Sequence, residues 1–137
     1  YIHKISKNIT DEYDIITCEK LHTKSMIIEG KKNTLSKNIN DACFNEIIRQ
    51  LEYKSKFKGK QFYQIYDYYP SSQTCSRCNN QDEKYKDLGE RIYDCTKCYL
   101  KLDRDLNASI NIMFEGLKMY IKNNKRNILK SNISMIK

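Results

Sequence analysis

Four cysteines, arranged as two Cys-x2-Cys pairs, constrain the fold of this chain more than any other feature. Cys75 and Cys78 form the first pair, and Cys95 and Cys98 form the second after sixteen intervening residues. This spacing is typical of two zinc knuckles that close one tetrahedral site, with another thiophilic metal as the alternative. Four thiolates leave no coordination position for water, so the metal would stabilise structure and not catalyse. We therefore predict one structural zinc ion in a small ribbon that draws its folding energy from the metal.

The other two cysteines and the apolar pattern indicate a chain that is not secreted. Cys18 and Cys43 stand alone among apolar residues, where we expect each to be a small buried side chain. No apolar run approaches the roughly 20 residues that span a bilayer, and the segment after Tyr1 lacks the charged start and apolar core of a secretory leader. Paired cysteines in such a chain point to metal and not to disulfides. We expect an intracellular protein, in the cytoplasm, the nucleoid or the nucleus, without a membrane partner.

The charge of the chain favours a polyanionic partner. Lys and Arg number 25 against 17 acidic residues, which gives a net charge of +8 and attracts nucleic acid. The predicted phosphate contacts are Lys54, Lys56, Lys58, Lys60, Arg77, Lys84, Lys86 and Lys97. Tyr85, Tyr93 and Tyr99 lie among them as candidate stacking faces for bases. The alternatives are an exposed helix end for the first four lysines, and tyrosines that cover a module too small for a true core.

Hydrophobic periodicity predicts alternating helices and strands. Ile2, Ile5 and Ile9 have helical spacing, so the chain is expected to begin partway through a helix. The run DIITCE at 14–19 is short, apolar and β-branched, which predicts a buried strand that ends at Glu19. The other expected elements are a loop over 21–32 with a helical turn near 26–28, an amphipathic helix over 34–58 that stops at Gly59, a strand over 61–67, a polar hairpin tip over 79–94, a helix over 104–122, and a basic tail with frayed helical character.

Four stretches of the chain carry a resemblance to a known family. They are IITCEKL at 15–21, RQLEYKSKFKGK at 49–60, YYPSSQTCSRC at 68–78 and DRDLNASINI at 103–112. In this order and at these separations they resemble the TnpB-type, transposon-encoded RNA-guided nucleases and their relatives among compact type V CRISPR effectors. YPSSQTCSRC followed by a second Cys-x2-Cys and by D-x-D-x-N-A is the most specific part of the match.

The resemblance implies an α/β fold. The chain would hold part of an RNase H-like (RuvC) nuclease core, with two core strands, two long helices and a zinc ribbon inserted before the last helix. Its parts would be the carboxyl-terminal part of the core at 1–70, the ribbon that binds target nucleic acid at 71–101, the last helix at 102–122 and a basic tail at 123–137.

The resemblance also implies a nuclease site. In this family three carboxylates bind two magnesium ions, which activate water and stabilise the leaving oxygen during phosphodiester cleavage. Glu19 matches the glutamate that ends the fourth strand of the core, and Asp105 matches the aspartate before Leu-Asn-Ala in the last helix. A simple helix-capping acid is the alternative for Asp105, and Asp103 is the other candidate for that cap. No residue of this chain matches the third carboxylate, which the family places on its first strand.

Other positions refine the comparison. Asn107 could orient the site or the target strand, and Lys20 stands where an acid commonly follows the glutamate. Asn79 and Tyr99 occupy knuckle positions usually given to glycine. Asparagine tolerates the left-handed backbone of such a turn, whereas tyrosine is strained by it, so we expect a distorted second knuckle.

Three functions are consistent with these features. The chain could be the carboxyl-terminal part of a magnesium-dependent DNA endonuclease, with Glu19 and Asp105 as two ligands. For the chain by itself we favour a DNA-binding fragment of such an enzyme that cannot cleave because one ligand is lacking, with guide RNA bound through regions outside this sequence. A structural zinc protein that binds other proteins is the third hypothesis. Salt dependence separates the last two, because phosphate contacts weaken steeply with salt.

Overall fold

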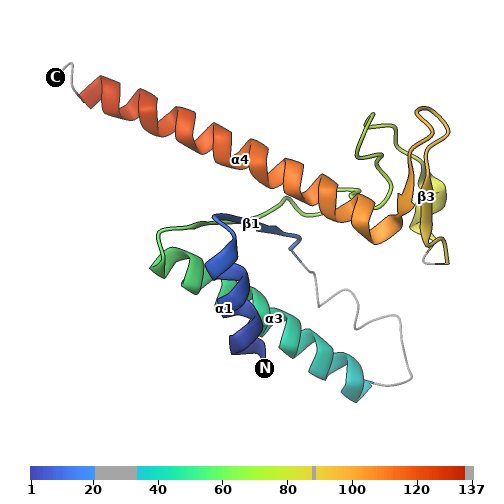
Figure 1. Cartoon of the computed structure of the whole chain (residues 1–137), viewed down its shortest axis with the longest axis horizontal. Coiled ribbons are helices and arrows are strands. Elements are labelled where there is room, and N and C mark those ends of the chain that lie inside the picture. Colours follow the sequence, from blue (N-terminus) through green and yellow to red (C-terminus); the bar gives the residue numbers. More distant parts are fainter. Residues whose placement is uncertain (21–33, 88, 135–137) are drawn as a thin grey trace. The chain divides into compact units, whose positions relative to one another are not determined.

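The chain folds into helices joined to short strands (Figure 1). The computed structural model describes residues 1–20, 34–87 and 89–134, and for 34–42 and 127–134 it describes the backbone alone. The predicted loop over 21–32, with its helical turn, lies outside the described residues. The elements are α1 (Ile2–Glu12), β1 (Ile15–Cys18), α3 (Thr34–Phe57), β2 (Gln61–Gln64), the short 3-10 helix η1 (Glu83–Lys86), β3 (Ile92–Asp94), β4 (Lys101–Asp103) and α4 (Arg104–Ser134). They divide into two compact units, Tyr1–Gln64 and Ile65–Lys137.

The first unit contains a parallel strand pair whose crossover includes α3. β1 and β2 run in parallel, with Ile15 opposite Gln61 and Cys18 opposite Gln64. The predicted strand at 14–19 and the predicted helix at 34–58 are confirmed. The second predicted strand, 61–67, is shorter than expected, because the ladder stops at the last residue of β1 and leaves no partner beyond it. A parallel pair with a helical crossover is an α/β arrangement, as predicted.

Helix α1 packs on α3 (Figure 1), and polar side chains of both helices are buried. Ser6 and Thr10 of α1 and Gln50 of α3 are buried, and the Ser6 hydroxyl donates to Gln50 Oε1 at 2.7 Å. The buried side of α3 continues to Ser55. Cys43 lies two turns before Gln50 and is exposed. The interpretation of Cys43 as a buried side chain is therefore wrong, because the buried side chains of α3 that the structure describes begin at Gln50.

Gly59 ends α3 as predicted. Its φ of +68° is left-handed, and the N–H of Lys60 donates to Ser55 O at 2.8 Å while the N–H of Gly59 donates to Lys56 O at 3.2 Å. These two bonds satisfy carbonyl groups that the helix end would otherwise leave open.

The second unit joins a cysteine-rich ribbon to the long helix α4 (Figure 1). β3 and β4 form an antiparallel hairpin, with Ile92 opposite Asp103 and Asp94 opposite Lys101. Helix α4 begins at Arg104, as predicted, and continues through Ser134 into the segment expected to be a frayed tail. The extension is consistent with the lack of Gly or Pro after Gly116. No helix within the described ranges is long and apolar enough to cross a membrane.

Candidate four-cysteine metal centre and nuclease residues

The four paired cysteines converge within the second unit. Their sulfur atoms all lie within 4.8 Å of one another. The Sγ atoms of Cys75 and Cys98 are 3.5 Å apart, and those of Cys78 and Cys95 are 3.6 Å apart. A tetrahedral ion with metal–sulfur bonds of about 2.3 Å requires sulfur separations of about 3.8 Å, whereas a disulfide requires about 2.05 Å. The donor set therefore fits one tetrahedral, thiophilic metal ion.

Each cysteine pair forms the same tight turn. The N–H of Asn79 donates to Cys75 O at 2.9 Å, and the N–H of Tyr99 donates to Cys95 O at 2.9 Å. Asn79 and Tyr99 have φ values of +59° and +57°. The expected distortion of the second knuckle is wrong, because Tyr99 adopts the left-handed backbone with its ring 84% exposed and clear of neighbours that would crowd it.

Burial and backbone amides set the ionisation of the sulfurs. Burial raises the pKa of the Cys75 thiol, opposed by the N–H groups of Cys78 and Arg77. For Cys95 burial also opposes ionisation, but backbone N–H groups and neighbouring thiols outweigh it, and the pKa falls to about 6. Burial raises the pKa of Cys98 to about 12. A metal ion binds cysteine as the thiolate, and its positive charge compensates the negative charge that the clustered sulfurs then carry.

Two tyrosines form the core of the ribbon together with Cys75 and Cys95. Tyr85 and Tyr93 are 1% and 0% exposed, and their rings stack with centroids 4.1 Å apart. The prediction that these two rings stack on bases is wrong, because η1 places Tyr85 over the inward-facing residue of β3. The predicted hairpin tip over 79–94 is likewise not uniformly polar and exposed. The alternative, in which tyrosines cover a very small module, is confirmed for Tyr85 and Tyr93.

The first turn of α4 carries the predicted catalytic aspartate. Asp103 caps the helix, with its Oδ1 accepting from the N–H groups of Asp105 at 2.8 Å and Leu106 at 3.0 Å. Asp105 is therefore not the capping residue, and its side chain is 77% exposed. Asp105 Oδ1 lies 3.8 Å from Arg104 Nε, and its exposed carboxylate is accessible to a further cation. Its role as a magnesium ligand stays a prediction.

Glu19, the second predicted ligand, immediately follows β1. It is half-buried and belongs to the first unit, whereas Asp105 belongs to the second. A carboxylate at the end of a parallel strand is a common position for a functional group in α/β folds. Its role in magnesium binding also stays a prediction.

Three of the lysines predicted to contact phosphate contact α1 instead. Lys54 Nζ donates to His3 O at 2.9 Å, Lys60 Nζ donates to Asp11 O at 2.9 Å, and Lys58 pairs with the carboxylate of Asp11. Phosphate would have to compete with these contacts. Lys56 is exposed and, among the described residues, has no such contact with α1.

The ribbon presents its basic residues in two ways. Lys84 lies 4.7 Å from the centroid of the Tyr85 ring, and Lys86 is 3.2 Å from Glu83. Arg77 and Lys97 precede the second cysteine of each pair, are exposed, and form no ion pair with any part of the chain that the structure describes. Among the described residues, these two predicted contacts of the ribbon differ from Lys84 and Lys86 in having no neighbouring acid or ring that engages their charge.

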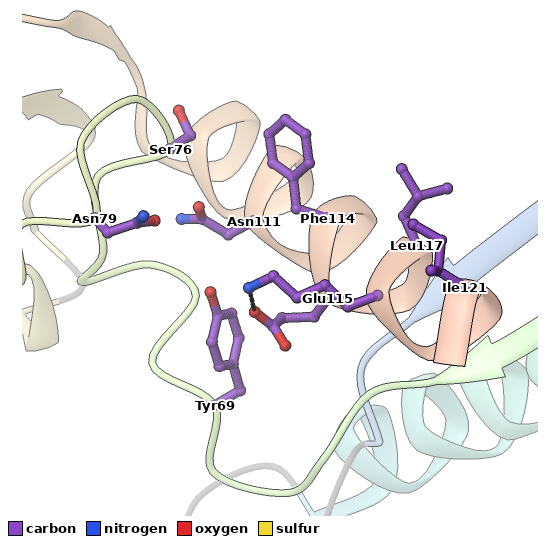
Figure 2. Close-up of a pocket in the computed structure, with 9 residues that line it drawn as sticks. Tyr69, Ser76, Asn79, Asn111, Phe114, Glu115, Leu117 and Ile121 are labelled. Atoms are coloured by element: carbon purple, nitrogen blue, oxygen red, sulfur yellow. Dashed lines mark hydrogen bonds and ion pairs between the residues drawn. The ribbon is translucent and has the colours of Figure 1, made fainter. Parts of the chain in front are cut away.

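An open pocket of about 400 Å³ lies where the first knuckle meets α4 (Figure 2). Its residues are Tyr69, Ser76, Asn79, Asn111, Phe114, Glu115, Leu117, Lys118 and Ile121. Figure 2 shows Asn111 directed from α4 toward the loop that carries Ser76 and Asn79. The Lys118–Glu115 pair, at 2.5 Å, lines the pocket together with Tyr69, and Figure 2 shows Glu115 near the Tyr69 ring.

Comparison with known proteins identifies the family. Residues 44–112, which include all four cysteines, match the model of the Cas12f1-like, TNB domain family. The chain belongs to this family of TnpB-like and Cas12f1-like proteins. It is 32% identical over 117 residues to a protein of Streptomyces pristinaespiralis named as an RNA-guided DNA endonuclease, a match that covers 85% of this chain and 28% of that protein. It is 31% identical over 124 residues to a TnpB-like protein of Acanthamoeba polyphaga mimivirus, covering 88% of this chain and 23% of that protein.

The fold is also shared with a solved member of the family. A Cas12f1 chain, determined by cryo-EM in a complex with sgRNA and target DNA, superimposes with a TM-score of 0.58 at 22% identity. The match covers 81% of this chain and 32% of that chain. The present sequence thus spans about a quarter to a third of the length of these relatives.

Proposed function

We propose that this chain is the DNA-binding, zinc-carrying part of an RNA-guided DNA endonuclease. The observation that supports this most strongly is the convergence of four cysteine sulfurs inside the segment that matches the family. Its relatives are named as RNA-guided DNA endonucleases and TnpB-like proteins. Target DNA would bind this chain, and guide RNA would bind regions outside the present sequence.

Zinc is the metal best suited to the cysteine cluster. Zinc accepts four thiolates in a tetrahedron and needs no further ligand. Cys75 and Cys95 are buried, which limits access of water to the ion. The zinc would hold the two knuckles together and would have no catalytic role.

The knuckle tips form the proposed DNA contact. Arg77 and Lys97 occupy equivalent positions in the two turns, and Tyr99 follows the second turn with an exposed ring. Cations that contact phosphate bind without reading sequence, and an exposed aromatic ring can stack on an unpaired base. Sequence would be read by the guide RNA through base pairing, as in RNA-guided effectors generally. Lys56 is the proposed phosphate contact of the first unit.

Cleavage would require the carboxylates of a RuvC-like site. Glu19 and Asp105 would supply oxygen ligands for two magnesium ions, and the resemblance implies a third carboxylate that no residue of this sequence matches. We therefore propose that residues 1–137 bind DNA without cleaving it. Magnesium bound by the complete ligand set would activate water and stabilise the leaving oxygen.

Salt-dependent binding tests the DNA-contact surface. Fluorescence anisotropy with single-stranded DNA, repeated over a range of KCl concentrations, should show affinity that falls steeply with salt. Replacing Arg77 and Lys97 together by Ala should lower the log–log slope by about 1.4, because each contact with single-stranded DNA contributes about 0.7. The matched control replaces Lys7 and Lys118, which are exposed but paired with neighbouring acids, and removes the same charge. If both double variants behave alike, the knuckle tips are not the contact, and if the wild type shows no salt dependence, a protein-binding role is favoured.

Magnesium-dependent cleavage tests the nuclease residues. In a protein that joins this sequence to the remaining regions of its family, together with guide RNA, Glu19→Gln or Asp105→Asn should abolish cleavage of target DNA. Glu90→Gln is the control, because it removes an exposed acid from the ribbon that is not a predicted metal ligand. Cleavage by residues 1–137 alone would show that the incomplete ligand set is not limiting.

A further inference from the structure

Two asparagines on α4 are buried and direct their amides at the first knuckle. Asn107 is 0% exposed and Asn111 is 3% exposed. Asn107 Nδ2 donates to Thr74 O at 2.7 Å, and Asn111 Nδ2 donates to Thr74 O at 2.6 Å and to Ser71 O at 2.8 Å. All of these acceptors are backbone carbonyls in the four residues before Cys75. The two asparagines therefore bind the backbone that leads into the metal centre.

A further bond reaches the knuckle itself. The N–H groups of Arg77 and Cys78 interact with the Cys75 sulfur. The N–H of Ser76, which precedes them in the turn, has a different partner. That group donates to Asn107 Oδ1 at 2.9 Å. One amide thus contacts the knuckle as donor and as acceptor, a combination that fixes its orientation.

The same helix turn carries the predicted magnesium ligand. Asn107 follows Asp105 by two residues, and both lie within the first turns of α4. We infer that Asn107 and Asn111 are positioning residues that transmit the order imposed by metal at the four cysteines to Asp105. This inference rests on the proposed nuclease function for the role of Asp105, but the coupling between knuckle and helix is independent of that role.

The coupling follows from the cost of burying amides. If the knuckle lost its metal and its fixed shape, Asn107 and Asn111 would lose their partners while still facing a buried surface, which is unfavourable. The first turns of α4 would then open together with the knuckle. Because such coupling is reciprocal, loss of the amides must also weaken metal binding at the cysteines.

Hydrogen exchange of the whole chain with and without zinc tests the coupling. In the presence of reductant, chelation of zinc should speed amide exchange over 105–112 by at least about tenfold, the effect expected when the net contribution of one or two hydrogen bonds is lost. Exchange in α1 should not change, since that helix packs in the other unit. Protection of 105–112 that is the same in the zinc-loaded and chelated chain would overturn the inference.

Two variants test whether the side-chain amides of Asn107 and Asn111 carry the effect of zinc on 105–112. Asn107→Ala combined with Asn111→Ala keeps all four cysteines, and it should bind zinc more weakly and lose most of the zinc-dependent protection over 105–112. Asn123→Ala, the same change at an exposed site on the same helix, should retain both. If the double variant loses zinc binding completely while Asn123→Ala keeps it, the reciprocal coupling is also supported. If zinc protects the amides of 105–112 as strongly in the double variant as in Asn123→Ala, the coupling is contradicted.

The completed nuclease distinguishes this inference from the proposed function. There, with zinc at a saturating concentration so that the knuckles stay formed, the double variant should need about tenfold more magnesium for half-maximal cleavage, the effect of losing about one hydrogen bond that positions Asp105, and its affinity for DNA should be unchanged. A role limited to general stability would lower DNA binding as well. If the completed protein never cleaves but the exchange result holds, the proposed function fails and the coupling stands. If it cleaves with an unaltered magnesium requirement, the positioning role fails and the proposed function stands.

Discussion

Removal of the hydroxyl group from Tyr85 and from Tyr93, the two core tyrosines of the ribbon, should lower the free energy of unfolding of the ribbon by different amounts. Tyr85→Phe and Tyr93→Phe both alter side chains that are at most 1% exposed. The Tyr85 hydroxyl accepts from the N–H of Asp94 at 2.7 Å and donates to the carbonyl of the same residue at 2.9 Å. The Tyr93 hydroxyl donates to the carbonyls of Gln73 at 3.1 Å and Asn80 at 3.2 Å.

The partner of Tyr85 has no substitute for the lost bonds. Backbone bonds from Arg104 N to Arg91 O and from Cys95 N to Leu100 O lie on both sides of Asp94. Because bonded and non-bonded pairs alternate in an antiparallel ladder, Asp94 occupies a non-bonded position with its N–H and carbonyl directed away from β4. Tyr85→Phe therefore leaves this N–H without a protein partner.

The partners of Tyr93 each keep another donor. Gln73 O accepts from the N–H of Asp82 at 2.9 Å, and Asn80 O accepts from the N–H of Cys75 at 2.8 Å. A hydrogen bond contributes about 1 kcal/mol net, and an orphaned buried donor costs about 1–3 kcal/mol. We expect Tyr85→Phe to lower the free energy of unfolding of the ribbon by about 3 kcal/mol, and Tyr93→Phe by about 1 kcal/mol.

Urea unfolding of the zinc-loaded chain measures both effects. The NMR amide signals of β3 and β4 report the ribbon directly and avoid tyrosine fluorescence, which the substitutions themselves change. Equal destabilisation by the two variants, or a larger effect of Tyr93→Phe, would refute the reasoning from unsatisfied backbone groups.

Three further predictions concern local features. Asp103→Ala removes the cap of α4 and should cost about 1 kcal/mol in urea unfolding of the second unit, whereas Asp105→Asn should leave stability nearly unchanged; equal effects would contradict the capping assignment. Gly59→Ala places a side chain at φ +68° and should destabilise the first unit by about 1–2 kcal/mol, and a neutral result in thermal unfolding would count against the left-handed turn. Hydrogen bonds from Lys58 and, to a smaller extent, Lys7 lower the pKa of Asp11 from 3.8 to about 2 in the folded chain, so the stabilising contribution of this carboxylate is present above its unfolded pKa of 3.8 and is lost as pH falls toward 2. Asp11→Asn should flatten the stability of the first unit in that window, and an unchanged pH profile would contradict this.

Elements with a strong local signal could be predicted from the sequence. The helices α1 and α3 follow from apolar residues at helical spacing, and Gly59 marks the end of α3 because few other residues tolerate its backbone conformation. The cysteine cluster follows from spacing, since two Cys-x2-Cys turns can close on one ion with few alternatives.

Features that depend on distant contacts could not be predicted. Tyr85 lies in the charged run Glu83–Lys86, where nothing in the local pattern marks it for burial. Apart from the cysteines, the buried core of the ribbon consists of Tyr85 and Tyr93. Tyr85 is buried because its ring stacks on the ring of Tyr93, which is a contact that the local sequence does not reveal. The contacts of Lys54 and Lys60 with carbonyls of α1 span about fifty residues, and charge patterning along the chain does not reveal them.

The buried asparagines of α4 illustrate the same limit. The sequence suggested that Asn107 could orient the site or the target strand and gave no prediction for Asn111, and only the fold shows that both satisfy the backbone of the first knuckle. The motif D-x-D-x-N-A marked the position, but its chemistry at Asn107 is explained by contacts more than thirty residues away.

X-ray absorption at the zinc edge, combined with metal analysis of the purified chain, tests the four-thiolate centre most directly. The account predicts one zinc per chain with four sulfur ligands at about 2.3 Å, lost when Cys78 or Cys98 is replaced by Ser and retained in Cys43→Ser. A chain that folds without stoichiometric metal, or an ion whose ligands include fewer than four sulfurs, would contradict it.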